Sequence, residues 1–138
     1  MQADSTTSSL RTTSGHARLP LATVCGALLA GLAVGLGAFG AHALKSHFDA
    51  PALATFETGV RYQMYHAFAL ILSGLLGALG HRTRTASWLF GTGILFFSGS
   101  LYGLALLEWR WLGPITPIGG TLFLSGWLAL ANAARKRR

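Results

Sequence analysis

Four long stretches of the chain contain no charged residue, and short polar segments separate them. The stretches are residues 19–44, 62–80, 85–107 and 111–134. An α-helix rises about 1.5 Å per residue, so about 20 apolar residues cross a hydrocarbon core of roughly 30 Å. Each stretch is close to this length or longer. The pattern predicts an all-α integral membrane protein built as a four-transmembrane-helix bundle.

The chain divides into two unequal regions. Residues 1–18 are rich in Ser and Thr and show no apolar periodicity, which predicts a disordered cytoplasmic tail. The first apolar stretch has 26 residues, compared with about 7–15 in the apolar part of a signal peptide, so we expect it to remain as a span. Residues 19–138 form the predicted membrane domain, with spans at about residues 20–44, 60–80, 85–107 and 113–134.

The basic residues predict the orientation of the helices. If all four stretches span the membrane, both termini share one side with the loop at residues 81–84, and that side carries eight of the 11 Lys and Arg residues. The opposite side carries Lys45, Arg61 and Arg110. Positive charge concentrates in the cytoplasmic loops of membrane proteins, so we expect the N- and C-termini to be cytoplasmic. The expected location is the cytoplasmic (inner) membrane of a bacterium.

Composition supports a membrane protein and argues against two other classes. Hydrophobic residues make up 51% of the chain and charged residues 11%, compared with about 25% charged in an ordinary soluble domain. The net charge of +7 comes from residues outside the apolar stretches, as in helix anchors, so we expect no nucleic-acid partner. The single Cys25 leaves no intrachain disulfide and no CxxC redox or zinc motif.

The first apolar stretch carries small residues on one helical face. Ala27, Gly31, Gly35 and Ala38 follow one another at steps of three or four residues. Small residues let two membrane helices approach closely, so Gly31 and Gly35 are predicted helix-packing positions. The pattern leaves open whether this face meets a neighbouring helix or another copy of the chain.

The segments between the stretches add two expectations. Asp49 can accept hydrogen bonds from the free N–H groups of a first helical turn, and Pro51 is preorganised for such a turn. We therefore expect a short interfacial helix that starts there and runs into the second span. Trp109 and Trp111 are expected at the membrane–water interface, where indole rings are enriched.

Polar side chains gather at the predicted outer ends of the helices. Residues 62 and 66 share one helical face, and residues 98 and 102 share another. Ionisable side chains within a span are costly and usually face a bundle interior or water. We call this set the polar seam, and its members are His42, Arg61, Tyr62, His66, Ser98, Ser100, Tyr102 and Thr116.

The polar seam has three interpretations. It can fix the register of the helices, it can line a water-accessible pocket for an ion, lipid head group or small solute, or it can hold a cofactor. A cofactor site would use His42 and His66 as haem or metal ligands. Two facing imidazoles need matched depth, and His66 lies several residues deeper than His42. We therefore expect no cofactor and no metal.

The sequence contains no motif with a known chemical mechanism. HExxH, GxSxG and P-loop patterns are missing, and no acidic residue lies within an apolar stretch. We expect a structural or accessory membrane protein that is not an enzyme. The alternatives are a small-solute or ion transporter acting as an oligomer and a haem- or quinone-handling membrane subunit. The expected partners are the lipid bilayer and either a homo-oligomer or a membrane-complex partner.

Four ordered sequence blocks resemble a known family. They are GAFGAHAL at residues 37–44, FETGVRYQMYH at 56–66, FSGSLY at 97–102 and ITPIGG at 115–120. They look like the signature blocks of the YgdD-like family, small four-helix inner-membrane proteins classed as a domain of unknown function. The resemblance covers roughly residues 20–134 and implies a fold and a membrane location, but no activity, catalytic residue or cofactor. It makes the polar seam, together with Pro117, the motif positions of this sequence.

Overall fold

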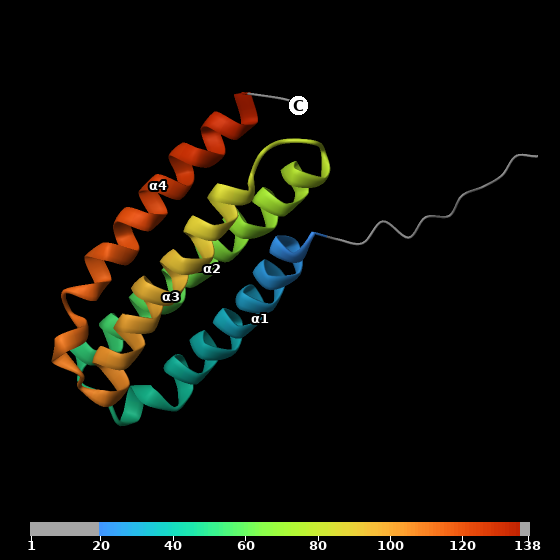
Figure 1. The fold of residues 1–138 in the computed structure, drawn as a ribbon. Coiled ribbons are helices and arrows are strands. Elements are labelled where there is room, and N and C mark those ends of the chain that lie inside the picture. The colour runs from blue at the N-terminus through green and yellow to red at the C-terminus, as the bar shows by residue number, and fades with distance from the viewer. Residues whose placement is uncertain (1–19, 136–138) are drawn as a thin grey trace, which may run out of the picture.

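The computed structural model describes residues 20–135, and these residues are almost entirely helical. The predicted all-α fold with four long helices is confirmed for this part of the chain. The predicted tail at residues 1–18 lies outside the described residues, as do residues 19 and 136–138. In chain order the helices are α1 (Leu21–His42), the 3₁₀ helix η1 (Leu44–Ser46), α2 (Ala50–Ala78), α3 (Arg84–Leu107), the 3₁₀ helix η2 (Arg110–Leu112) and α4 (Ile115–Arg135) (Figure 1).

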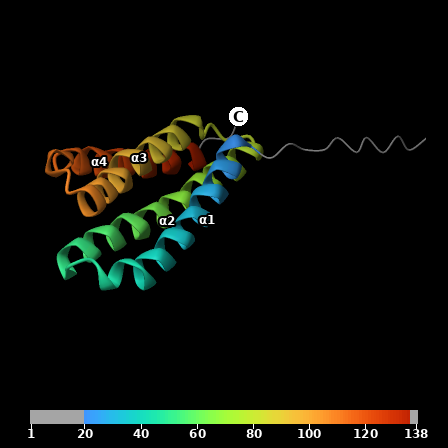
Figure 2. The same ribbon diagram turned by 90° about the horizontal axis from the view of Figure 1, so that it is seen from below.

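Helices α2 and α3 form the middle of the molecule. They pack on each other, α1 packs on the outer side of α2, and α4 packs on α3 with a smaller contact to α2. Helices α1 and α4 therefore lie at the two outer edges (Figure 1). Viewed from below, α1 and α2 form one layer and α3 and α4 form the other (Figure 2). The helices follow one another in an open series, in which α2 contacts each of the other three long helices.

Helix α2 begins where the sequence predicts. Oδ1 of Asp49 accepts a hydrogen bond from the backbone N–H of Ala52 at 2.9 Å, and Pro51 lies in the first turn. Both features stabilise a helix start. The helix continues to Ala78 as one element of 29 residues, so the predicted interfacial helix and second span are continuous. Gly80, with a φ of 93°, then turns the chain toward α3.

Three helical segments are long and apolar enough to cross a membrane. They are Leu21–Ser46, Arg84–Leu107 and Arg110–Arg135. Helix α2 is longer than α1, α3 and α4, but it does not reach the same hydropathy. Its central part carries Arg61, Gln63 and His66, whose polar side chains offset the apolar residues around them. The least apolar helix is thus also the one that contacts each of the other three long helices.

The outer surface of the helices is strongly apolar. Leu28 of α1, Leu95 of α3 and Leu128 of α4 are 69%, 69% and 73% exposed. Water-soluble monomers rarely expose large continuous apolar surfaces, whereas a bilayer solvates them. The fully buried large side chains are Phe56 and Phe90, which lie between the helices. This distribution suits a chain surrounded by lipid.

Helices α1 and α2 approach closely at Gly26, away from the predicted packing positions Gly31 and Gly35. A Cβ on Gly26 would lie 2.7 Å from the carbonyl oxygen of Ala67 and 2.7 Å from Cγ1 of Ile71. A Cβ on Gly31 or Gly35 would meet nothing within 4 Å. Within one chain these two glycines leave their face open. Contact of that face with another copy of the chain stays a prediction.

We predict that Gly26→Ala destabilises the fold and that Gly31→Ala does not. The methyl group added at residue 26 overlaps the backbone of α2, and overpacking of this kind costs about 1–3 kcal/mol. The methyl group added at residue 31 enters open space, and Ala favours a helix more than Gly does. Unfolding of the purified protein in increasing denaturing detergent, followed by circular dichroism, measures both changes. Equal losses of unfolding free energy in Gly26→Ala and Gly31→Ala would show that the Gly31 face is packed against a second copy.

Candidate functional site

The structure brings six of the eight polar-seam residues to contacts between helices. The buried members lie on α2 and α3, and the others lie at the edges of the same contacts. The centre of the set is near the midpoint of α2, because α2 starts at Ala50, well before the predicted span at about residues 60–80. The six residues are Tyr62, His66, Ser98, Ser100, Tyr102 and Thr116.

His42 and Arg61 do not join the other members. His42 is the last residue of α1 and is exposed, and Arg61 is exposed on α2. The chain turns through η1 after His42 and enters α2, where His66 lies several turns from the helix start. The two imidazoles therefore lie at different depths and cannot face each other across one cofactor.

Gln63 of α2 links three helices. Its side chain is 2% exposed. Nε2 donates a hydrogen bond to the carbonyl oxygen of Leu29 in α1 at 2.9 Å, and Oε1 accepts one from the hydroxyl of Tyr102 in α3 at 2.9 Å. The carbonyl of Leu29 can only accept, so it determines which end of the amide faces α1. One side chain on α2 thereby holds both α1 and α3 in register.

A second hydrogen bond joins α2 and α3 beside Gln63. The hydroxyl of Ser98 donates to the carbonyl oxygen of Gly59 at 2.7 Å. The ring of Tyr102 passes over Gly59, where a Cβ would lie 2.8 Å from Cε1 of the ring. On its other side the ring packs on Phe56, with ring centroids 5.2 Å apart. The missing side chain at Gly59 is what lets Tyr102 reach Gln63.

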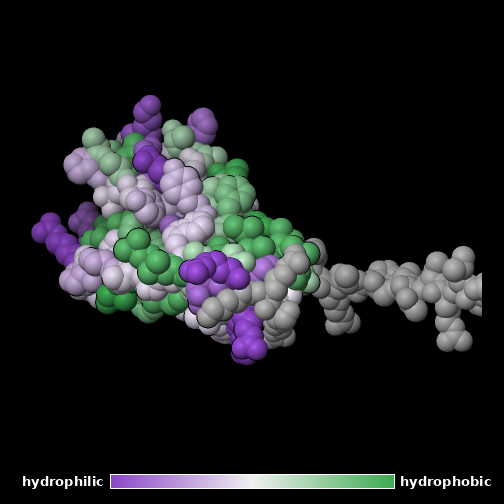
Figure 3. Space-filling model, turned by 90° about the horizontal axis from the view of Figure 1, so that it is seen from above, coloured by the Kyte–Doolittle hydropathy of each residue, from purple (hydrophilic) through white to green (hydrophobic). Residues whose placement is uncertain are grey.

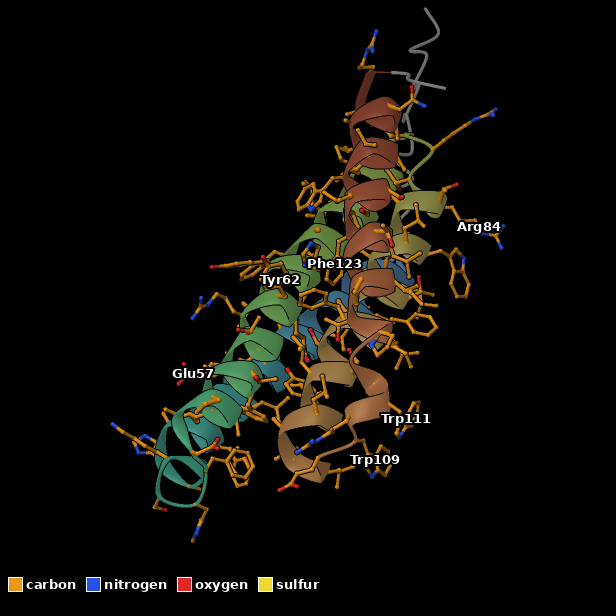
Figure 4. The ribbon with its side chains drawn as sticks, turned by 90° about the vertical axis from the view of Figure 1, so that its left-hand side faces the viewer. Glu57, Tyr62, Arg84, Trp109, Trp111 and Phe123 are labelled. Atoms are coloured by element: carbon orange, nitrogen blue, oxygen red, sulfur yellow. The ribbon has the colours of Figure 1, made fainter. Side chains whose placement is uncertain are left out.

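His66 connects α2 to α4. Nδ1 lies 2.8 Å from the carbonyl oxygen of Tyr62, and Nε1 of Trp127 donates to Nε2 at 3.3 Å. The indole N–H can only donate, so Nε2 accepts and the ring carries its proton on Nδ1. The imidazole also stacks on Phe123 of α4, with centroids 3.4 Å apart and planes 4° apart. Figure 4 shows Tyr62 and Phe123 at mid-height in the molecule.

Ser100 connects α3 to α4. Its Oγ lies 2.7 Å from Oγ1 of Thr116 and 2.9 Å from the carbonyl oxygen of Phe97. A serine that donates to Phe97 can accept from Thr116, so both hydroxyl protons have a partner. We call the hydrogen-bonded set the interhelical network, and its side chains are Gln63, His66, Ser98, Ser100, Tyr102, Thr116 and Trp127.

Two members of the interhelical network, Gln63 and Trp127, are not part of the polar seam predicted from the sequence. Gln63 carries no charge and therefore did not interrupt the second apolar stretch. An amide has two donors and an acceptor, however, and within a hydrocarbon core these groups need protein partners. That requirement alone could have singled out Gln63. Trp127 had no such signal, because an indole near a helix end is equally typical of an interfacial anchor.

The interhelical network offers hydrogen bonds to the fold and few free groups to a ligand. Both ring nitrogens of His66 and both ends of the Gln63 amide are engaged within the protein. Among residues 20–135, the buried side-chain atom without a hydrogen-bond partner is Oγ1 of Thr23, which lies beside Gly74 and outside the network. The same residues contain no group of three or more His, Cys, Asp or Glu side chains placed to hold a metal ion. The arrangement is suited to helix registration.

Comparison with known proteins places this fold in a family. Residues 36–120, which include most of the interhelical network, match the family described as "Protein of unknown function (DUF423)". The chain belongs to the DUF423 family. No solved structure gives a significant match.

Relatives of the chain in several bacteria are named membrane proteins. The UPF0382 membrane protein SERP0230 of Staphylococcus epidermidis is 49% identical over 114 residues, which cover 82% of this chain and 93% of that protein. YwdK of Bacillus subtilis is 46% identical over 117 residues, 82% of this chain and 94% of that protein. A UPF0382 membrane protein of Haemophilus influenzae is 47% identical over 108 residues, 76% and 86% of the two chains.

Family membership confirms the coarser part of the sequence analysis. The chain is a member of an uncharacterised family of membrane proteins, as the four sequence blocks indicated. The family has no assigned activity, in agreement with the expected unknown biochemical function. The YgdD-like assignment within this wider family stays a prediction.

We predict that Tyr102→Phe lowers the free energy of unfolding by about 0.6 kcal/mol, the average for an interhelical hydrogen bond in a membrane protein. The matched control is Tyr65→Phe, since Tyr65 is 55% exposed on the same molecule. In a Gln63→Leu background the effect of Tyr102→Phe should disappear, because the acceptor of its hydroxyl is gone. Unfolding in denaturing detergent measures the free energy of unfolding of Tyr102→Phe, Tyr65→Phe, Gln63→Leu and the Gln63→Leu/Tyr102→Phe double variant. A loss at Tyr102 that is independent of residue 63 would contradict the shared hydrogen bond.

Proposed function

We propose that this DUF423 protein is a structural or accessory membrane protein without enzymatic activity. The observation that carries the proposal is that α2 is hydrogen-bonded through side chains to α1, α3 and α4. The polar groups of the interhelical network form contacts inside the fold. A protein of this kind would act by presenting a fixed outer surface to lipid and to other membrane proteins.

We further propose that all four long helices span the cytoplasmic membrane, with both termini in the cytoplasm. The 29 residues of α2 exceed the roughly 20 residues that a bilayer requires. Its low hydropathy is offset by the partners that Gln63 and His66 find on neighbouring helices. The orientation is supported by the eight-to-three distribution of basic residues along the sequence.

The transporter and cofactor alternatives receive less support from the geometry. A transporter of small solutes needs polar groups that line a water-filled path, and the members of the interhelical network face one another instead. A haem subunit needs an imidazole nitrogen free to bind iron, whereas Nε2 of His66 already accepts from Trp127. Among the partners proposed, a second copy of the chain is favoured by the open glycine face of α1.

The topology prediction can be checked with reporter fusions in living cells. Fusions after Arg138 and within residues 82–84 should behave as cytoplasmic, and a fusion near Asp49 should behave as external. The physical reason is that the basic residues of the first two sites remain on the side where they are synthesised. An external carboxyl terminus, or a fusion near Asp49 on the same side as Arg138, would contradict four spans with cytoplasmic ends.

A structural role predicts that the purified full chain moves no solute of its own. Proteoliposomes containing the protein should show the same ion and solute flux as empty liposomes, and the absorption spectrum should lack haem bands. His66→Phe should leave the proteins that co-purify from native membranes unchanged, because the stack on Phe123 is retained. Flux that His66→Ala abolishes and Tyr65→Ala preserves would overturn the proposal in favour of a transporter.

A further inference from the structure

A cavity opens at the end of the molecule where α1 begins, α2 ends and α3 begins. Its volume is about 900 Å³. Helices α1 and α3 both pack on α2 and leave a space between them at this end, and the floor of the space is formed by Leu70, Gly74 and Gly77 of α2. Gly91 on the α3 wall has nothing within 4 Å of where a Cβ would stand. The cavity is therefore a consequence of the open helix series together with glycines on its walls.

The rim of the cavity is basic. Arg82, in the turn before α3, and Arg84, the first residue of α3, both line it and are both exposed. The acidic residues of the described chain are Asp49, Glu57 and Glu108, which all lie toward the opposite end of the helices. Figure 4 shows Arg84 in the upper part of the molecule and Glu57 in the lower part. The positive charge at this rim thus has no carboxylate nearby within residues 20–135.

The start of α3 adds to the positive potential at the rim. Thr83 precedes the helix without a side-chain hydrogen bond to it, and the first turn contains no acidic residue. The first N–H groups of a helix carry partial positive charge and favour anions. By contrast, the start of α2 at the other end of the molecule is capped by Asp49.

Below the rim the cavity wall is apolar. Leu21 and Cys25 of α1 and Trp88 of α3 line it, and Trp88 is 65% exposed. Seen from this end, hydrophilic side chains stand beside hydrophobic surface (Figure 3). Free phosphate would use only the rim. A molecule with an anionic phosphate head and an apolar tail would use the whole cavity.

We propose that this cavity binds one anionic phospholipid, with its phosphate between Arg82 and Arg84 and an acyl chain against the apolar wall. Arginine pairs well with phosphate because its planar guanidinium can donate two parallel hydrogen bonds. Basic pockets between membrane helices are a known recognition mode for anionic lipid heads. The proposal requires only that the chain lies in a membrane and does not depend on the structural role proposed above.

The test measures binding of defined lipids to the full chain in detergent by native mass spectrometry. The probes are phosphatidylglycerol, phosphatidylcholine with the same acyl chains, and inorganic phosphate. Arg82→Gln/Arg84→Gln removes the rim charges, and Lys45→Gln/Arg110→Gln removes the same net charge at the opposite end. Gly91→Leu fills the cavity, and Gly99→Leu, on the same helix and also without a neighbour within 4 Å, is its control.

We expect one phosphatidylglycerol per chain, bound at least about tenfold more tightly than phosphatidylcholine, since each basic residue near an anionic lipid contributes on the order of 1 kcal/mol. Arg82→Gln/Arg84→Gln and Gly91→Leu should each weaken phosphatidylglycerol binding about tenfold or more. The control variants Lys45→Gln/Arg110→Gln and Gly99→Leu should leave this binding unchanged. Equal binding of the two lipids, or equal losses in both charge variants, would overturn the site. Displacement of the lipid by inorganic phosphate at similar concentration would show a free-phosphate site instead.

Discussion

In the proposed four-span topology the fold depends on one requirement, that polar side chains placed within a hydrocarbon core find partners inside the protein. Gln63 finds such partners on two helices. Its amide donates to the carbonyl of Leu29 in α1 and accepts from the hydroxyl of Tyr102 in α3. Sliding α2 along either neighbour by one residue would break one of these bonds. Apolar packing alone would not oppose such a shift of α2 as strongly, because an apolar side chain that leaves a helix contact can pack on lipid tails, which are as apolar as leucine.

The central position of α2 follows from the same requirement. A helix that carries Gln63 and His66 is the least suited of the four to face lipid, and it is the helix with neighbours on several sides. The hydrogen bonds of α2 to α1 and α3 are possible because the helices approach one another closely at glycines. Gly59 lets the ring of Tyr102 lie across α2, and Gly26 lets α1 come near enough for the carbonyl of Leu29 to be reached. The glycines and the hydrogen-bonding residues therefore act together.

Much of the fold could be predicted from the sequence, and less of the site. The four helices follow from the length of the apolar stretches, and the start of α2 follows from Asp49 and Pro51. The position of the polar residues along the helices was harder to predict. The predicted second span begins near residue 60, whereas the helix that contains it begins at Ala50, so that His66 lies near the middle of the helix.

The sequence also predicts poorly which face of a helix contacts its neighbour. Small residues mark a possible contact without saying which partner it has: Gly26 contacts α2, whereas Gly31 has no neighbour within one chain. The predicted outer depth groups His42 with His66, yet His42 is exposed at a helix end and His66 is buried. Pairing between helices is a tertiary property. Periodicity along one helix contains no information about the partner, and the contact of Trp127 with His66 therefore has no signal in the sequence.

The open helix series gives the two ends of the molecule different properties. Around mid-helix the side chains of the interhelical network join α2 to α1, α3 and α4. Toward the start of α3, Nδ1 of His81 lies 3.0 Å from the carbonyl oxygen of Ala133 in α4, but among residues 20–135 no side-chain hydrogen bond joins α1 to α3, and the cavity lies between these two helices. A cavity in a membrane protein that opens toward lipid is filled by lipid, since a void would lose dispersion contacts on all its walls. The charges at the rim then decide which lipid is favoured. A fold held together by polar contacts at its centre can therefore select its lipid neighbour at one end.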